Sequence, residues 1–173
     1  MTQSVAVGKK YDTGKPTFRL LLEDHGGTLA AILADMPKFS HEEASRPLSA
    51  KVWAEWFNPA MERDLVSLAT ETAQRLIAYG EGWPWVGLPL ADVVGYGARK
   101  YAARNWRLVP DGAQRYAEAV YRHSYAWVFE NEEKDKESGY PHWTHILWNC
   151  LALLYFLRGT DPRVVYPDPV PAV

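Results

Sequence analysis

The sequence predicts an all-α fold, a compact helical bundle with an extended N-terminal arm. Several long segments repeat apolar residues at helical spacing, and residues 146–157 are apolar almost all round. No segment shows the sustained alternation of apolar and polar residues that predicts a strand. The chain has 173 residues, of which 47% are hydrophobic, and this is enough for a sizeable core. We therefore expect a single helical domain that spans residues 1–173.

The N-terminal half combines an arm, an apolar segment and one clear helix. Glycine and proline residues break any regular run in residues 1–18, which predicts an extended arm. Residues 20–36 are rich in Ala and Leu, but Gly26-Gly27 interrupts them. Residues 59–79 predict a helix, because a proline suits the first turn and apolar residues follow at i, i+3, i+4 and i+7. Residues 82–90 contain several Gly, Pro and Trp residues and predict a loop.

Three further helices are expected in the C-terminal half. They cover about residues 90–103, 112–131 and 138–158, and the second follows a Pro-Asp-Gly turn signal. Ser138 is the predicted N-cap of the last helix and Gly159 its stop. The last helix carries the apolar run, so we expect it at the centre of the core.

Charge and composition limit the classes of partner. Lys and Arg total 19 against 21 acidic residues, so nothing in the composition requires a nucleic-acid partner, which would favour a concentrated basic surface. No stretch approaches about 18 apolar residues, and the N-terminus has no long apolar region. We expect a cytoplasmic protein with no membrane partner. The single cysteine, Cys150, excludes an internal disulfide and predicts a buried, inert thiol.

Two histidines and an amide form a polar stripe on the otherwise apolar last helix. His142 and His145 are separated by i, i+3, and His145 and Asn149 by i, i+4, so all three share one face. Burying these groups costs free energy unless each finds a partner. The partners could be other side chains in a structural network, a metal ion or a ligand.

Carboxylates precede this stripe. Glu132, Glu133, Asp135 and Glu137 lie just before the last helix, where the helix dipole favours negative charge. Such oxygen ligands could hold Mg²⁺ or Mn²⁺, which bridge to substrate phosphates. The alternative interpretation is a solvated, charged loop.

The preceding helix adds cationic side chains. Arg115 and Arg122 are separated by i, i+7 and share a face, while His123 aligns with Glu130 by the same spacing. An inward guanidinium pairs with a carboxylate or a phosphate. A structural Arg–Glu pair and a phosphate site therefore both remain open for Arg115.

A third polar group lies further upstream. Gly97 allows close approach to the helix backbone, and Lys100 offers a mobile positive charge to a phosphate. Trp106 offers a flat face for a base. Each of these is an ordinary feature when taken alone.

Taken together, these motifs resemble a known family, the phage-associated domain described as the N-terminal region of dATP/dGTP diphosphohydrolases. The pattern K-Y-D-x-G-K-P is followed by G-A-x-K-Y, N-W, R-H, D-x-E-S-G-x-x-H-x-x-H and a final N. In this chain the motifs are Lys10 to Pro16, Gly97 to Tyr101, Asn105-Trp106, Arg122-His123, Asp135 to His145, and Asn149. The ordered set is much more specific than any one motif.

The resemblance implies a nucleotide pyrophosphohydrolase related to the helical MazG-type enzymes. These use Mg²⁺ or Mn²⁺ to cleave a (d)NTP into the monophosphate and pyrophosphate, so the implied partner is a small nucleotide such as dGTP or dATP. The implied metal ligands are Asp135, Glu137 and His142. The implied catalytic residues are Glu137, His142 and His145, with a histidine as general base. The implied substrate-binding residues are Lys15, Lys100, Tyr101, Asn105, Trp106, Arg122, His123 and Asn149.

The chain departs from the expected pattern in two places. Residues 20–89 look like an inserted helical segment relative to the family, and the E-E-x-x-E and E-x-x-D metal pair of MazG-type enzymes is absent. MazG-type enzymes are usually oligomers, which favours a homodimer by analogy. A phage-encoded member would work in the cytoplasm of its host.

Two other classes of function fit the same residues. A non-catalytic module would bind a nucleotide in this cluster without hydrolysing it. An interaction protein would use the polar set as an internal network and dock a partner through the tryptophan-rich residues 83–88. A phosphohydrolase of the HD kind is disfavoured, because the chain contains no His-Asp doublet.

Overall fold

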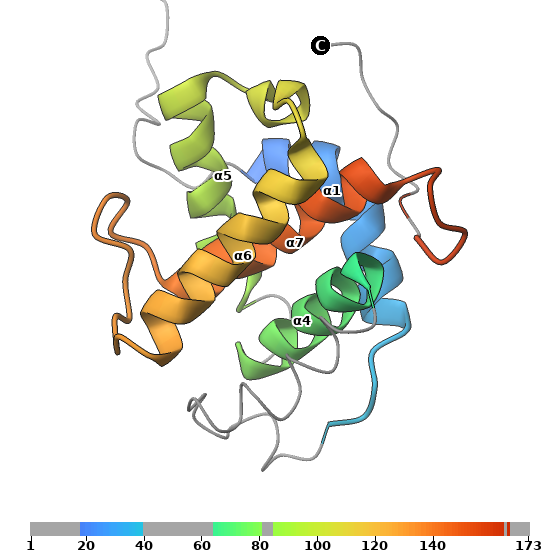
Figure 1. The fold of residues 1–173 in the computed structure, drawn as a ribbon, viewed down its shortest axis with the longest axis horizontal. Coiled ribbons are helices and arrows are strands. Elements are labelled where there is room, and N and C mark those ends of the chain that lie inside the picture. The colour runs from blue at the N-terminus through green and yellow to red at the C-terminus, as the bar shows by residue number, and fades with distance from the viewer. Residues whose placement is uncertain (1–17, 40–63, 81–84, 165, 167–173) are drawn as a thin grey trace, which may run out of the picture.

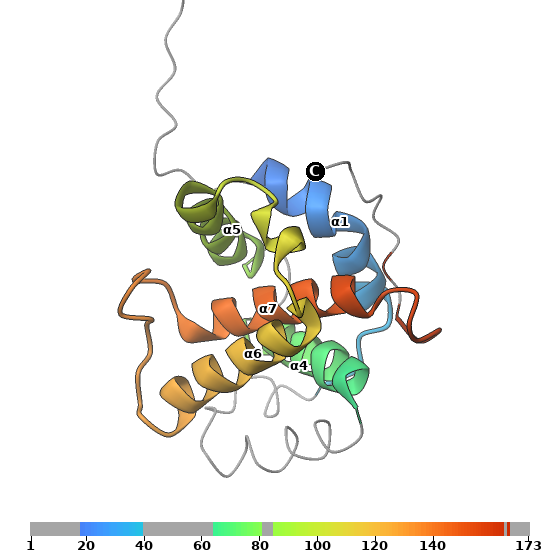
Figure 2. The same cartoon turned by 45° about the horizontal axis from the view of Figure 1, so that its top comes forward.

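Helix α7 (His142–Leu157) is the central element of the computed structural model, which describes residues 18–39, 64–80, 85–164 and 166. Almost every side chain from Thr144 to Tyr155 is buried. A helix that is apolar all round must be covered all round. Figures 1 and 2 show α7 crossing the middle of the molecule, with the other helices packed around it. The prediction of a central C-terminal helix is confirmed.

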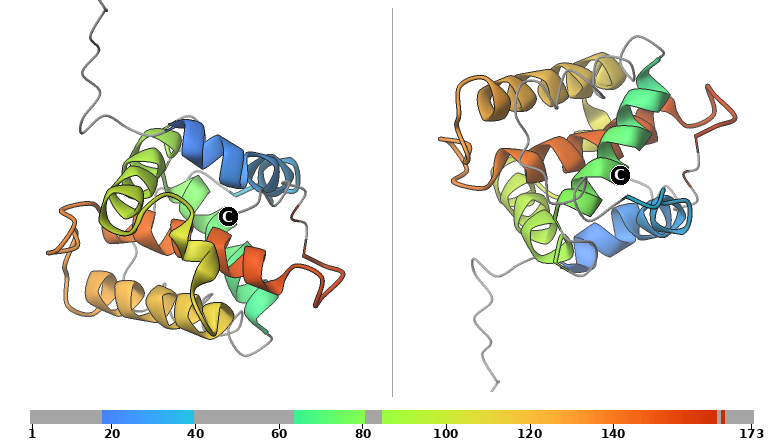
Figure 3. Two further views of the ribbon diagram at one scale, coloured as in Figure 1. Left: turned by 90° about the horizontal axis from the view of Figure 1, so that it is seen from above. Right: turned by 90° about the horizontal axis from the view of Figure 1, so that it is seen from below.

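Among the described residues, three helices pack directly on α7, and a fourth packs on two of these three. Helix α6 (Gly112–Val128) and helix α4 (Leu65–Tyr79) make the most extensive contacts with it. Helix α5 (Gly87–Tyr101) also packs on α7, and helix α1 (Phe18–Ala34) packs on α5. Figure 3 shows α7 lying between α6 on one side and the pair α1 and α5 on the other. The described residues contain no β-strand, so the all-α class is confirmed.

One hydrophobic core joins the five helices. Each helix contributes side chains with little or no exposure, and burial of each leucine or isoleucine contributes about 1.5–3 kcal/mol. The cluster includes Leu21 and Leu29 of α1, Leu68 and Leu76 of α4, Leu90 of α5, Val120 of α6, and Ile146 and Leu151 of α7.

Helices α1 and α4 differ from what the sequence predicted for these segments. Helix α1 continues through Gly26 and Gly27, the pair expected to interrupt it. Each helical glycine costs about 1 kcal/mol relative to alanine, and the burial of Leu21 and Leu29 outweighs that cost. Helix α4 begins at Leu65, where the Asp64 carboxylate caps it by accepting the Ser67 N–H at 2.8 Å. The residues around 59, where the sequence placed this start, lie outside the described residues.

Helices α5 and α7 also begin at unexpected residues. Helix α5 begins at Gly87, so residues 87–90 are helical rather than part of a loop, and it ends before Ala102 at a φ of 73°. The predicted N-cap at Ser138 is wrong, because α7 begins at His142 after Pro141. Gly139 has a φ of 75°, and this left-handed conformation interrupts any helix starting at Ser138.

The tightest glycine contact occurs where α6 begins. A Cβ added to Gly112 would lie 2.3 Å from Cζ of Phe156, and two more atoms of that ring lie within 2.6 Å. The ring is itself stacked on Tyr116, at 5.6 Å between ring centroids. We expect Gly112→Ala to lower the free energy of unfolding by about 1–3 kcal/mol through overpacking, measured by urea denaturation.

The matched control is Gly97→Ala, because a Cβ at Gly97 meets no atom within 4 Å. Removal of a mid-helix glycine should raise stability there by up to about 1 kcal/mol. Equal stability of Gly112→Ala and the parent protein would mean that the Phe156 ring moves aside freely.

Among the described residues, no helix has the length and apolar character needed to cross a membrane. Helices α1 and α6 have 17 residues each, whereas a membrane-spanning helix needs about 20 predominantly apolar ones. The cytoplasmic location expected from the sequence remains a prediction.

Candidate functional site

Three side chains from different elements form a candidate metal-binding triad. His123 comes from α6, Asp135 from the connection between α6 and α7, and His142 is the first residue of α7. Each offers one ligand atom, and these atoms all lie within 4.8 Å of one another. The Nδ1 atoms of the two histidines are 2.9 Å apart. The sequence grouped His142 with Asp135, and the packing of α6 on α7 adds His123 to them.

A short hairpin in the connection places Asp135 in the triad. Lys134 and Pro141 form an antiparallel bridge. The Asp135 N–H donates to the Tyr140 carbonyl at 2.9 Å, and the Gly139 N–H donates to the Asp135 carbonyl at 2.8 Å. The left-handed φ of Gly139 closes this turn without the strain that another residue would suffer there.

Ser138 links Asp135 to the second histidine of α7. Its N–H donates to the Asp135 carboxylate at 2.8 Å, and its hydroxyl shares a hydrogen bond of 2.7 Å with Nε2 of His145. Burial raises the pKa of Asp135, but the hydrogen bonds from Ser138 and the nearby imidazoles of His145 and His123 outweigh this effect. The net pKa is lowered, so Asp135 is ionised at neutral pH and can act as a ligand.

The ring of His123 stacks on the ring of His145. The centroids are 4.6 Å apart and the planes are within 5° of parallel. Burial is the main reason that the pKa of His123 falls to about 3, and the neighbouring His145 and His142 lower it further. Burial also lowers the pKa of His145, although Asp135 opposes the shift. His123 and His145 are therefore neutral at physiological pH, with a nitrogen lone pair available on each ring.

A cavity of about 550 Å³ adjoins the triad on the far side of His145. Residues of α1, α5, η1 (Asn105–Leu108), α6 and α7 line it. Figure 2 shows the segment that contains η1 running from α5 past α1 to α6. The lining includes Gly97, Tyr101, Asn105, Trp106, Arg115, Arg122, His145 and Asn149. Most substrate-binding residues expected from the sequence thus lie around one cavity.

Asn149 lies in the buried wall of this cavity. Its amide nitrogen donates to the backbone carbonyl of His145 at 2.7 Å, and only 5% of the residue is exposed. Among the described residues, nothing donates a hydrogen bond to its Oδ1 atom. The side chain therefore keeps one acceptor and one N–H for a molecule in the cavity.

Arg115 and Arg122 lie on the wall that α6 contributes, as their i, i+7 spacing predicts. Both are exposed, and neither forms an ion pair within the described part of the chain. The structural Arg–Glu pair considered for Arg115 is absent there. Both arginines thus line the cavity without a carboxylate partner from the described residues, which suits an anionic ligand.

Lys100 and Glu137 form an ion pair with each other. The Lys100 ammonium also lies 4.8 Å from the ring centroid of Tyr101, and the hydrogen bond that it donates to Glu137 is the main reason that the pKa of Lys100 is raised. Glu137 is largely exposed and is not a member of the triad. Its metal-binding and catalytic roles, and phosphate binding by Lys100, remain predictions. Lys15 lies outside the described residues.

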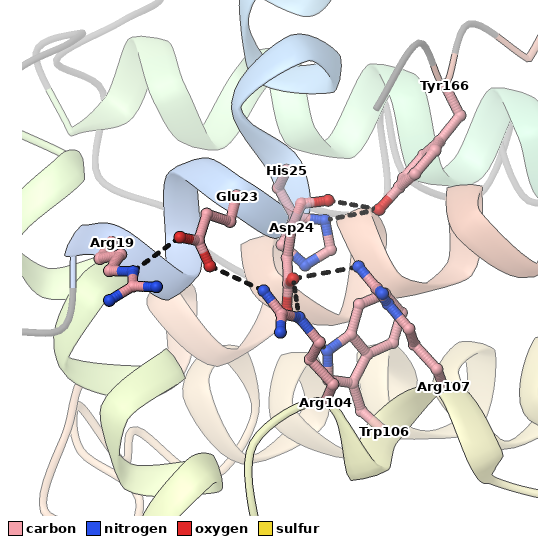
Figure 4. A network of polar contacts seen from close by, with 8 residues as sticks. All are labelled: Arg19, Glu23, Asp24, His25, Arg104, Trp106, Arg107 and Tyr166. Carbon is pink, nitrogen blue, oxygen red and sulfur yellow. Dashed lines mark hydrogen bonds and ion pairs between the residues drawn. The ribbon is translucent and has the colours of Figure 1, made fainter. Parts of the chain in front are cut away.

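Trp106 is held in place by a network that the sequence did not reveal (Figure 4). The buried Asp24 carboxylate accepts hydrogen bonds from Trp106 at 3.3 Å, Arg104 at 2.9 Å and Arg107 at 3.0 Å. The indole also packs edge-on against Tyr155, at 4.8 Å between centroids. Trp106 is therefore a fixed part of the cavity wall.

The same network ties three distant segments together. Tyr166 donates to the Asp24 carbonyl at 2.6 Å, and Arg104 also pairs with Glu23 at 2.7 Å. These contacts join α1, the turn after α5 and the C-terminal segment across 80 or more positions of sequence. Local spacing carries no signal for such pairs, because it reports only contacts within one element.

A family model described as "dATP/dGTP diphosphohydrolase, N-terminal" matches residues 71–163, which is more than half of the chain. The chain belongs to this family. The dATP/dGTP diphosphohydrolase N-terminal region of this chain begins within α4 and ends after α7. It contains the triad and both cavity arginines, whereas α1 and its Asp24 lie outside it.

Neither the curated proteins nor the solved structures gave a match to this member of the dATP/dGTP diphosphohydrolase N-terminal family. Its family description names a hydrolase, and the triad offers a place for a metal ion. The proposed insertion at residues 20–89 and the single-domain boundary remain predictions.

Proposed function

We propose that the cavity binds a purine deoxynucleoside triphosphate and that the adjoining triad supports its hydrolysis to the monophosphate and pyrophosphate. The observation that carries this proposal is the contact between the two places. His145 lines the cavity, and its ring stacks on His123 of the triad. A phosphate at this end of the cavity would lie next to the triad, and the family description names dATP and dGTP.

The phosphates occupy the α6 side of the cavity in this proposal. Arg122 is adjacent in sequence to His123, and Arg115 lies two turns earlier on the same face. Guanidinium groups bind phosphate oxygens through paired hydrogen bonds and stabilise the charge that develops in the transition state. Among the described residues, neither arginine is paired with a carboxylate, so phosphate binding would break no ion pair there.

His123, Asp135 and His142 would hold the divalent ion, for which Mg²⁺ and Mn²⁺ are the candidates. The residues fit this role, because the Nδ1 atoms of the two histidines face each other at 2.9 Å and the ligand atoms of all three residues lie within 4.8 Å of one another. Such an ion polarises the phosphate and lowers the pKa of the attacking water. The hairpin and Ser138 hold the Asp135 carboxylate in position for it.

His145 is the proposed general base. Water adds to the α-phosphorus, the bond from this phosphorus to the bridging oxygen breaks, and pyrophosphate leaves while the proton passes to the imidazole. His145 is neutral before the reaction, because burial lowers its pKa. Ser138 fixes the ring through its hydrogen bond to Nε2.

The base lies in the opposite part of the cavity. A volume of about 550 Å³ suits a ligand of nucleotide size. Trp106 and Tyr101 supply aromatic wall, and Asn149 offers an acceptor and a donor for the edge of a purine. Asn105 lines the same wall.

A product assay tests the proposal. The purified protein is incubated with each dNTP and with Mg²⁺ or Mn²⁺, and monophosphate, diphosphate and nucleoside are separated. We expect monophosphate and pyrophosphate in equal amounts from dATP or dGTP, with turnover abolished by a chelator.

Three results would overturn the hydrolytic proposal. Release of inorganic phosphate with a diphosphate product would place the attack on a different phosphorus. No turnover, together with a rise in melting temperature on adding nucleotide, would instead identify a binding module. Absence of both effects would favour the interaction protein.

A further inference from the structure

The triad has the donor chemistry of a transition-metal site. Two of its three ligand atoms are imidazole nitrogens and one is a carboxylate oxygen. Mg²⁺ prefers oxygen ligands, keeps much of its water and is held through carboxylates and substrate phosphates. Imidazole nitrogen instead suits first-row transition metals such as Mn²⁺, Fe²⁺, Co²⁺ and Zn²⁺. We infer that the triad binds a first-row transition-metal ion in preference to Mg²⁺. A role of this ion in catalysis rests on the proposed function.

The two histidines lie close enough to share an ion. Their Nδ1 atoms are 2.9 Å apart, the distance of a hydrogen bond. Two ligands of one tetrahedral ion, each at about 2.1 Å, lie about 3.4 Å from each other. A small outward movement of the two rings would therefore make room for a shared transition-metal ion. Without an ion, the two nitrogens have to share a single proton between them.

The carboxylate of Glu132 lies near Nε2 of His142, the ring nitrogen that does not face His123. The Oε2 atom of Glu132 lies 3.7 Å from Nε2 of His142, which has no hydrogen-bond partner among the described residues. Histidines that bind a metal usually donate their other N–H to a carboxylate or a carbonyl, which fixes the tautomer and the ring. Glu132 is the positioning residue in that role, after a small approach of the two side chains.

The other histidine ligand, His123, is held by ring stacking. His123 stacks on His145, and Ser138 in turn holds His145 by a hydrogen bond of 2.7 Å. The triad provides only three protein ligands, and sites with open positions for water or substrate are typical of catalytic metals.

Metal binding is measured on the full chain after treatment with a chelator and without nucleotide. Titration with Mn²⁺ is followed by the electron paramagnetic resonance signal of the free ion. We expect one Mn²⁺ ion per chain, retained against an approximately 100-fold excess of Mg²⁺, because nitrogen ligands discriminate against Mg²⁺. Co²⁺ should give a visible absorption band that Zn²⁺ removes by competition.

Two substitutions that roughly keep the size of the side chain test whether the ion binds at the triad. His123→Gln and Asp135→Asn should each weaken Mn²⁺ binding by at least about 10-fold, while Glu118→Gln, on the exposed surface of α6, should leave it unchanged. Circular dichroism without metal checks that each variant is folded. Displacement of Mn²⁺ by an equal concentration of Mg²⁺, or undiminished Mn²⁺ binding in folded His123→Gln and Asp135→Asn, would overturn the inference.

The result is independent of turnover. Selective Mn²⁺ binding without hydrolysis would support the metal site and count against the proposed hydrolysis. Hydrolysis that proceeds with Mg²⁺ in a protein that does not bind Mn²⁺ would support the hydrolysis and overturn the metal inference.

Discussion

Replacement of Asp135 by Asn is expected to lower kcat for dGTP or dATP hydrolysis by at least about 100-fold, because the metal contributes several kcal/mol to the transition state. The substitution keeps the size of the side chain and an oxygen that can accept the Ser138 N–H, now at 2.8 Å. It removes the only negative charge in the triad. The fold should survive, and steady-state kinetics with product separation measures the loss.

The same experiment separates Asp135 from Glu137. The sequence implied both as metal ligands, whereas the structure places Asp135 in the triad and pairs Glu137 with Lys100. We expect the loss of kcat in Glu137→Gln to stay below about 10-fold, as for a charge outside the reacting groups. An equal loss in the two variants would favour the sequence-based ligand set, and full activity in Asp135→Asn would exclude the triad as the catalytic metal site.

Replacement of Gly97 by Leu is expected to weaken nucleotide binding strongly without weakening the fold. Gly97 lines the cavity, and a Cβ added there meets no atom within 4 Å, so a larger side chain enters open space. Leucine also has a helix propensity higher than glycine by about 0.8 kcal/mol. We expect KM to rise by at least about 10-fold, together with loss of the nucleotide-induced rise in melting temperature and an unchanged or higher melting temperature without nucleotide.

Two further variants make this result specific. Gly97→Ala adds one methyl group and should keep KM close to that of the parent protein while raising stability. Ala119→Leu fills the cavity from the opposite wall, on α6, and should reproduce the effect of Gly97→Leu. An unchanged KM in both leucine variants would mean that the nucleotide binds elsewhere.

The helices and the general location of the site were predictable from the sequence. The apolar run of residues 146–157 identified the central helix, because a segment that is apolar all round has to be buried. The i, i+7 spacing placed Arg115 and Arg122 on one face, and both line the cavity. The ordered motifs indicated the family that the match to residues 71–163 establishes. All of these signals are local or depend on the order of short motifs.

The role of Ser138 was not predictable in the same way. A serine before an apolar run is a typical N-cap, yet this serine holds Asp135 and His145, and the helix begins four residues later. The left-handed φ of Gly139 decides between the two arrangements. A sequence pattern does not distinguish a cap from a turn that precedes the helix, because Ser favours both.

By itself, the sequence determined that the chain is helical, which helix is buried on all sides, and where polar side chains are concentrated. Only the tertiary structure decided that His123 joins Asp135 and His142, that Glu137 pairs with Lys100, and that Asp24 anchors Trp106. The physical reason is that helical periodicity assigns a side chain to a face of its own helix. Which faces then meet depends on how the other described helices pack around α7, and that packing is a property of the whole core.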